Sequence, residues 1–204
     1  MFYEKYWTEK NIRLTDFDLK WYKLKYFIPR EGNFNLVDFG CGKGDILGEI
    51  IKINPNLKCI GLDVSSEALQ KAKAILSQVD FKKIEDGGSF PVDSSSIDFV
   101  FSSEVMEHVY DTENAFKEIS RILKPRGKFL ITVPYHGFIK NLLITIFNFD
   151  QHFDPIGPHI RFFSKKTLKR ELERVELTIV HCGYYGRFWP IPHSIFILAE
   201  KKYG

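Results

Sequence analysis

A glycine-rich turn follows directly on an apolar run, and this junction constrains the fold of the chain most. Residues 36 to 44 read Leu-Val-Asp-Phe-Gly-Cys-Gly-Lys-Gly, and apolar residues at helical spacing follow from Ile46. Glycines allow the backbone to approach a ligand closely where a strand ends at the crevice of an α/β sheet. The junction therefore predicts a strand, a ligand-binding turn and a helix.

A short strand expected downstream ends in Asp63, nineteen positions after Gly44. A carboxylate at the end of this next strand can accept hydrogen bonds from both hydroxyl groups of a ribose. We therefore expect a cofactor that contains adenosine. In this interpretation Asp63 binds the ribose, and Gly40, Gly42 and Gly44 form the cradle.

The charge of the turn separates two kinds of cofactor. A dinucleotide site requires Gly-x-Gly-x-x-Gly, but this chain has Asp45 where the last glycine would stand. Unit charges about 5 Å apart at an effective dielectric constant near 20 repel by roughly 3 kcal/mol, so Asp45 disfavours a pyrophosphate. Asp38, two residues before Gly40, adds a second carboxylate. S-adenosylmethionine, which is cationic, fits better than NAD, and a nicotinamide-dependent reductase is the less favoured alternative.

At this point the sequence resembles the class I S-adenosylmethionine-dependent methyltransferases. The resemblance is strongest over residues 34 to 134, in five segments at the right order and spacing: Leu36–Gly44, Gly61–Ser65, Glu85–Pro91, Ile97–Val109 and Leu123–Pro134. The stretch Glu-Val-Met-Glu-His-Val within the fourth segment leans toward the branch with ubiquinone-biosynthesis O-methyltransferases. Two positions depart from the pattern: Gly87-Gly88 replaces a small or acidic pair, and Arg126 replaces a glycine.

This resemblance implies a fold and a set of cofactor contacts. The fold would be a single-domain, Rossmann-like α/β structure with a mainly parallel seven-stranded sheet, helices on both faces and the last strand antiparallel. The residues implied to bind S-adenosylmethionine are Asp38, Gly40, Cys41, Gly42, Gly44, Asp63, Val64, Asp86, Gly87, Ser103 and Glu104. Asp86 would accept a hydrogen bond from the adenine amine, although a solvated loop aspartate is nearly as good an interpretation.

We expect one methyltransferase domain over residues 1–204, in four parts: an N-terminal cap (1–33), a cofactor-binding core (34–134), a lid insert (135–163), and a helix with a C-terminal hairpin (164–204). In the cap, Tyr3, Tyr6, Trp7 and Trp21 either close over the cofactor or simply pack.

Periodicity and capping residues place most of the remaining elements. Helices are expected from about 46 to 53, after Ser65, from Asp111 or Thr112, and after Ser164. Pro125 to Gly127 should turn the chain into a strand over 129–133. The final strands are expected at about 177–182 and 194–200, and the loop 183–192 between them should face the substrate.

Two histidines are candidate catalytic groups. His108 follows the central strand and His136 opens the insert, and a neutral imidazole near physiological pH can act as a general base. A hydroxyl acceptor would need such a base, whereas a carbon or amine acceptor would not. For His108, a structural hydrogen bond that anchors the loop is an equally good interpretation.

The insert from Tyr135 to Phe163 contains seven aromatic residues and three histidines. Connections of this length are usually functional. A lid with an apolar helix over 138–149 is the first interpretation, followed by a plain packed cap and then by a membrane or dimer contact. The predicted substrate-lining residues are Tyr135, His136, His152, His159, Tyr185, Arg187 and Trp189. The spacing of histidines and aspartates matches no strong ligand pattern, so no metal site is predicted.

Composition narrows the remaining classes. A net charge of +3 gives no argument for nucleic acid, and three distant cysteines form neither a disulfide framework nor a zinc site. The first residues lack an apolar signal region, and the most apolar stretch is too short to span a bilayer. We expect a cytoplasmic enzyme that methylates a small molecule, compatible with a homodimer. A catalytically silent relative that only binds is the main alternative function.

Overall fold

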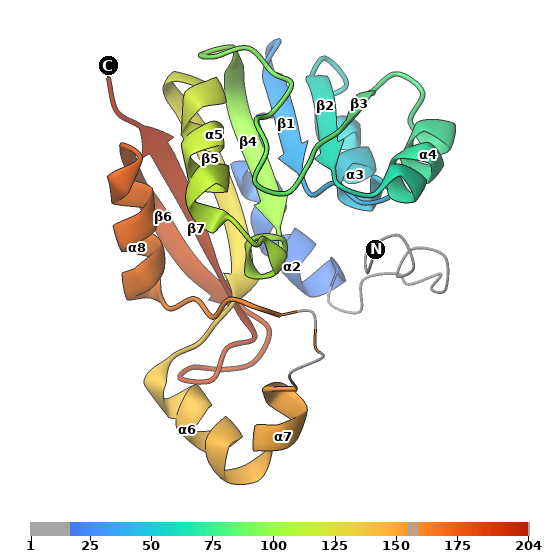
Figure 1. Cartoon of the computed structure of the whole chain (residues 1–204). Coiled ribbons are helices and arrows are strands. Elements are labelled where there is room, and N and C mark those ends of the chain that lie inside the picture. Colours follow the sequence, from blue (N-terminus) through green and yellow to red (C-terminus); the bar gives the residue numbers. More distant parts are fainter. Residues whose placement is uncertain (1–16, 155–156, 158, 204) are drawn as a thin grey trace.

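The computed structural model describes residues 17–154, 157 and 159–203 (Figure 1). Tyr3, Tyr6 and Trp7 of the predicted cap lie outside these residues. Trp21, the fourth aromatic residue of that prediction, packs beside the core that includes Leu24 and Ile28.

The centre of the molecule is a seven-stranded sheet in the order β3-β2-β1-β4-β5-β7-β6. Neighbours from β3 to β5 pair in parallel, and β7 pairs antiparallel with both β5 and β6. The predicted fold class is therefore confirmed. The strands are β1 (Asn35–Phe39), β2 (Lys58–Asp63), β3 (Asp80–Lys83), β4 (Ile97–Ser103), β5 (Leu123–Pro134), β6 (Leu177–Tyr185) and β7 (Ser194–Lys201).

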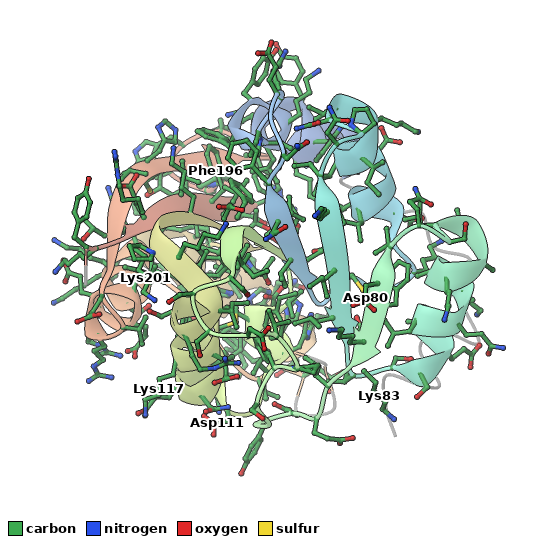
Figure 2. All side chains as sticks on the ribbon, turned by 90° about the horizontal axis from the view of Figure 1, so that it is seen from above. Asp80, Lys83, Asp111, Lys117, Phe196 and Lys201 are labelled. Carbon is green, nitrogen blue, oxygen red and sulfur yellow. The ribbon has the colours of Figure 1, made fainter. Side chains whose placement is uncertain are left out.

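Helices cover both faces of the sheet. One face carries α2 (Phe17–Leu24), the short helix η1 (Lys25–Phe27) and α3 (Asp45–Ile53), and the other carries α5 (Thr112–Ile122) and α8 (Lys165–Arg174) (Figure 1). Helix α4 (Ser66–Ile75) connects β2 to β3. Figure 2 shows this division from above, with Phe196 on the α2 side and, on the other side, Lys117 of α5 and Asp111, the N-cap of that helix.

The alternation of side chains along the strands produces two separate cores. Val100 of β4 packs in the core beneath α5 and α8, while its neighbours Phe99 and Phe101 pack in the core beneath α3. Successive side chains of a strand point to opposite faces, so a run that is apolar throughout is buried on both faces. This explains why Phe99 to Phe101, which are apolar at all three positions, lie in the central strand of the sheet.

The predicted helix starts are confirmed by the capping hydrogen bonds. The Ser65 hydroxyl accepts from the backbone N–H of Ala68 at 3.2 Å, and the Asp111 carboxylate accepts from that of Asn114 at 2.9 Å. Ser164 forms a reciprocal capping box with Thr167. Each cap supplies an acceptor for a backbone donor that lacks an intrahelical partner.

Three element boundaries differ from the sequence predictions. Pro125–Gly127 lies inside β5 as an irregularity of the ladder, where Arg126 adopts φ +64°. The left-handed backbone explains why a glycine is usual there. Strand β6 continues to Tyr185, so the loop begins at Gly186 rather than at residue 183. The apolar helix ends earlier than predicted, as α6 (Phe138–Phe147), and a short α7 (Phe149–His152) follows it.

The insert leaves and rejoins the sheet at one point. Tyr135 and Phe163 form an isolated parallel bridge, and the His136 N–H donates to the Phe163 carbonyl at 2.9 Å. Helices α6 and α7 lie beyond the carboxyl ends of β5 and β6 (Figure 1). The insert therefore lies at the carboxyl ends of the parallel strands, where parallel α/β folds bind their ligands.

Candidate functional site

A cavity of about 500 Å³ opens at the carboxyl ends of β1, β2 and β4. Strand β1 is flanked by β2 on one side and by β4 on the other, so the chain reverses its direction of winding at this point. Ligands of open α/β sheets bind at such a reversal. The cavity is also within the size range of small-molecule and cofactor sites.

The glycine turn forms one wall and is tied to the neighbouring strand. The N–H groups of Gly40 and Cys41 both donate to the Leu62 carbonyl, at 2.8 and 3.1 Å. Gly40 has φ +76°, and a Cβ added there would lie only 2.3 Å from a methyl carbon of Val105. Only glycine satisfies both the backbone conformation and this close approach.

Asp63 is held in place from both sides at the end of β2. Its Oδ2 accepts from the Gly42 N–H at 2.8 Å, and its Oδ1 accepts from the Ser65 N–H at 2.9 Å. A carboxylate oxygen can accept more than one hydrogen bond, so this anchoring is compatible with binding of ribose hydroxyls. The same carboxylate thus links the glycine turn to the start of α4.

The lining of the cavity is strongly acidic. Two lysines, Lys43 and Lys83, face six carboxylates, namely those of Asp38, Asp45, Asp63, Glu85, Asp86 and Glu104. Burial, and then the charge of Asp63, raise the pKa of Asp38 to about 7, while the charge of Lys20 acts in the opposite direction. The surroundings therefore favour a cationic ligand over a pyrophosphate.

Glu104, directly after β4, is the centre of a hydrogen-bond network. Its Oε1 accepts from the hydroxyl groups of Thr132 and Tyr185, both at 2.8 Å. Burial, and then the charge of Glu104, hold the pKa of Tyr185 well above its usual value, so this hydroxyl remains a donor. Glu104 itself has φ +56°, a strained conformation for a side chain that is not glycine and one often found at functional sites.

Lys20 extends this network from the opposite side. Its ammonium group donates to the Ser103 hydroxyl at 2.9 Å, and that hydroxyl lies 3.0 Å from the Thr132 hydroxyl. Lys20 is almost completely buried and belongs to α2. The N-terminal part of the chain therefore contributes a positive charge close to the cavity wall.

At the other end of the cavity, the loop after β3 is fixed to α5. The Asn114 amide donates to the carbonyls of Gly87 and Gly88, both at 3.1 Å, and Asp86 accepts from the Tyr110 N–H at 3.1 Å. The Phe90 ring lies against this region, with its centre 5.0 Å from that of Phe39.

Ten of the eleven predicted cofactor-binding residues line the cavity. Gly44 does not, because it is the N-cap of α3 with φ +83° and faces Leu76. The sequence interpretation missed the contributions of Lys20 and Asn114. Lys20 precedes every motif, and Asn114 resembles any polar residue in the first turn of a helix, so neither carries a local signal.

The two candidate catalytic histidines occupy different environments. His108 lines the cavity, whereas His136 does not. His136 is buried in the insert, where its Nδ1 lies 3.1 Å from the Asn141 side-chain oxygen. Burial lowers its pKa to about 4, which makes it a weak base at neutral pH.

None of the seven predicted substrate-lining residues lies on the cavity wall. They are distributed around it instead. Tyr135, Tyr184 and Trp189 form an aromatic cluster with ring centres 5.1 to 6.3 Å apart, and Tyr185 contacts Glu104 rather than the cavity. His152 contacts the His136 ring at 5.3 Å, and Arg187 belongs to the β6–β7 loop. Their role as substrate contacts stays a prediction.

His159 is brought against His108 by the end of the insert, with ring centres 4.8 Å apart. Together with Glu107, these side chains place three donor atoms within 4.8 Å of one another. Burial, and then the charge of Glu104, raise the pKa of Glu107. The spacing along the chain gives no hint of this group, because His159 lies far from His108 in the sequence.

Fold and cavity together define a nucleoside-binding α/β domain, and comparisons with known proteins are consistent with that class. Residues 30–171 match the protein family described as "Methyltransferase domain". Trans-aconitate 2-methyltransferase from Azoarcus sp. (strain BH72) is 28% identical over 107 residues, which cover 52% of this chain and 42% of that protein. Malonyl-[acyl-carrier protein] O-methyltransferase from Hahella chejuensis is 29% identical over 164 residues, covering 78% of this chain and 54% of that protein.

Among solved structures, an S-adenosylmethionine-dependent methyltransferase from Aquifex aeolicus superimposes with a TM-score of 0.71. It is 16% identical, and the match covers 92% of this chain and 93% of that one. The chain belongs to the class I, S-adenosylmethionine-dependent methyltransferase family, and S-adenosylmethionine is the cofactor of that family. The predicted family and cofactor are therefore confirmed.

The chain spans about half the length of the two relatives that it matches. Among the described residues, no helix is both long enough and apolar enough to cross a bilayer.

Proposed function

We propose that the protein transfers the sulfonium methyl group of S-adenosylmethionine to a small-molecule acceptor by in-line displacement. The observation that carries this proposal is the acidic cavity at the strand reversal, where six carboxylates face two lysines. The leaving group is a neutral thioether, so catalysis needs alignment and exclusion of water rather than stabilisation of a new anion.

The contacts within the cavity support a distinct role for each wall. Asp63, oriented by two backbone N–H groups, would accept the ribose hydroxyls. Asp38 faces the cationic part of the cofactor, directly or through water. Asp86 and Gly87 lie at the adenine end, where Phe90 supplies an apolar surface. Ser103 ends the central strand and Glu104 follows it, next to the expected position of the methionyl group.

For a hydroxyl acceptor, His108 is the better of the two candidate bases. It lines the cavity, whereas His136 is buried outside it with a pKa of about 4. A general base must reach the proton that it removes and should have a pKa near the working pH. His136 is therefore better explained as a structural residue of the insert, held by Asn141.

The relatives support the proposed acceptor class. The two relatives named above methylate trans-aconitate and a malonyl group on a carrier protein, which favours a small or carrier-bound acceptor. A closer relation to the ubiquinone-biosynthesis branch is supported by Glu-Val-Met-Glu-His-Val of the Ile97–Val109 segment. A cytoplasmic location and a homodimer remain predictions.

Calorimetric titration with S-adenosylmethionine, S-adenosylhomocysteine and NAD tests the first half of the proposal. We expect binding of both sulfur compounds and none of NAD, because of the acidic lining. Binding of NAD alone would refute the assignment of the cavity.

Methyl transfer is then measured with labelled S-adenosylmethionine across a panel of hydroxyl, carboxylate, amine and carbon acceptors. Transfer to any of them supports an enzyme. Tight cofactor binding with no transfer across the panel would favour the catalytically silent relative.

A further inference from the structure

We propose that Glu107, His108 and His159 bind a divalent transition-metal ion, of the Zn²⁺ type, at the acceptor side of the cofactor cavity. The inference deepens the proposed methyl transfer and rests on it, and it replaces the role of His108 as a general base with that of a metal ligand. It also departs from the expectation that the spacing of histidines and aspartates gives no metal site.

The strongest observation is the state of Glu107. Its side chain is only 1% exposed, yet among the described residues neither carboxylate oxygen has a hydrogen-bond partner. The His108 imidazole lies beside this carboxylate, with Nε2 3.8 Å from Oε1, which is beyond hydrogen-bond distance. Buried carboxylates are normally paired, hydrogen-bonded or coordinated to a metal. Glu107 therefore lacks the partner that its burial requires.

The chain brings a second imidazole to this carboxylate. His159 comes from the distant end of the insert, and the backbone beside it is fixed to Glu107. The N–H groups of Ile160 and Arg161 both donate to the Glu107 carbonyl, at 3.0 and 3.1 Å, and the Arg161 guanidinium donates to the Tyr110 carbonyl at 2.7 Å. These hydrogen bonds keep His159 against His108 and Glu107.

Distances and ligand types favour Zn²⁺ or a similar ion. One carboxylate oxygen and two imidazole nitrogens match a His₂Glu site that leaves a coordination position open. Their donor atoms lie within 4.8 Å of one another, and donors around a tetrahedral ion are roughly 3.4 Å apart. The donor atoms must therefore move closer together when the ion binds, and rotation of the exposed His159 side chain allows this movement. Mg²⁺ and Ca²⁺ prefer oxygen ligands throughout, so they fit less well.

The location gives the ion a role, because His108 lines the cavity in which the cofactor would lie. A hydroxyl acceptor bound at the open position would lose its proton to solvent more readily. Its oxygen would then bond to the methyl carbon while the carbon–sulfur bond breaks and that electron pair stays on sulfur. The products are the methyl ether, S-adenosylhomocysteine and one proton.

Co²⁺ is a suitable probe, because its visible absorption reports nitrogen and oxygen ligands directly. The chelator-treated full chain is titrated with Co²⁺, and Zn²⁺ and Mg²⁺ are tested as competitors. His159→Ala removes an exposed ligand and Glu107→Gln removes the buried charge with little change in shape. His152→Ala is the matched control, because it removes a different imidazole of the same insert. Thermal unfolding and S-adenosylmethionine binding are measured for every variant.

We expect one Co²⁺ ion per chain, displaced by Zn²⁺ but not by Mg²⁺. His159→Ala and Glu107→Gln should each weaken Co²⁺ binding at least about tenfold, while His152→Ala should not, and all variants should still bind S-adenosylmethionine. Unchanged Co²⁺ binding by both ligand variants, or no Co²⁺ binding by a wild-type chain that binds S-adenosylmethionine, would overturn the metal site alone. Failure of the wild-type chain to bind S-adenosylmethionine would overturn the proposed function and, with it, the catalytic role of the ion.

Discussion

The cofactor cavity and the insert meet at the same edge of the sheet, yet they are built in opposite ways. The cavity is made of strand ends and turns whose backbone groups are hydrogen-bonded to one another, around buried carboxylates. In the insert, α6 buries Lys140 while Phe138, Ile146 and Phe147 are each more than half exposed. Contacts within the chain thus hold the cavity in shape, whereas the exposed apolar side chains of α6 are not covered by other described residues.

A substitution in the glycine turn should have the largest effect. Gly40→Ala adds a methyl group 2.3 Å from Val105 at a residue with φ +76°. We expect a loss of roughly 3–5 kcal/mol in the free energy of unfolding, with loss of cofactor binding. Denaturant unfolding and calorimetry would measure both effects.

Gly48→Ala is the matched control for Gly40→Ala. Gly48 lies within α3, where an added Cβ meets Leu76 at an ordinary 3.7 Å. Alanine is favoured over glycine in a helix, so this variant should gain about 0.5–1 kcal/mol. Similar stabilities for the two variants would show that the turn adapts, and would weaken the contrast between cavity and insert.

Asp38 should couple the stability of the cavity to pH. Its folded-state pKa of about 7 lies above the unfolded value of 3.8, so the folded chain keeps a proton that the unfolded chain has released. The stabilisation that Asp38 contributes to the folded state is complete below about pH 4 and is lost as the pH rises through 7. Asp38→Asn should therefore be more stable than wild type at pH 8, by on the order of 4 kcal/mol, and similar to it at pH 4.

Cofactor binding should show the opposite dependence on pH. A cationic ligand requires ionised Asp38, so the affinity of the wild-type chain should fall as the pH drops below about 7. Calorimetry from pH 5.5 to 8.5 would detect this fall, and Asp38→Asn should remove it. A wild-type affinity that is independent of pH would place Asp38 away from the charge of the cofactor.

Asp63→Ala should lower the affinity for S-adenosylmethionine at least tenfold, because a charge-assisted contact to both ribose hydroxyls is worth roughly 1.5–3 kcal/mol. Asp98→Ala is a suitable control. Asp98 also accepts a backbone N–H, that of Asn35, and pairs with Lys124, but it lies at the opposite end of the sheet. An unchanged dissociation constant for Asp63→Ala, or an equal loss for both variants, would contradict the ribose assignment.

Features of the structure that are encoded by neighbouring residues could be predicted from the sequence, whereas those that depend on distant contacts could not. Gly40 and Asp63 could be assigned because adjacent residues carry the turn, the strand end and the helix cap together. The sequence predicts no strand over β3, because Asp80–Lys83 is short and mostly polar and lies at the edge of the sheet. Lys20 and His159 reach the site through tertiary packing across long separations in sequence, and no local pattern encodes such contacts.

The smallest effect is expected at the exposed face of α6, and it tests whether that face is exposed in solution. Phe147 is 78% exposed, so Phe147→Ser should change the free energy of unfolding by less than about 0.5 kcal/mol. Phe116, which is 1% exposed on the buried face of α5, provides the contrast, and Phe116→Ala should cost about 3–5 kcal/mol. Denaturant unfolding and sedimentation of the wild-type and variant chains would measure both. A dimer that dissociates on Phe147→Ser, or a loss of several kcal/mol, would show that the insert is packed against another surface and that its apolar face is as fully specified as the cavity.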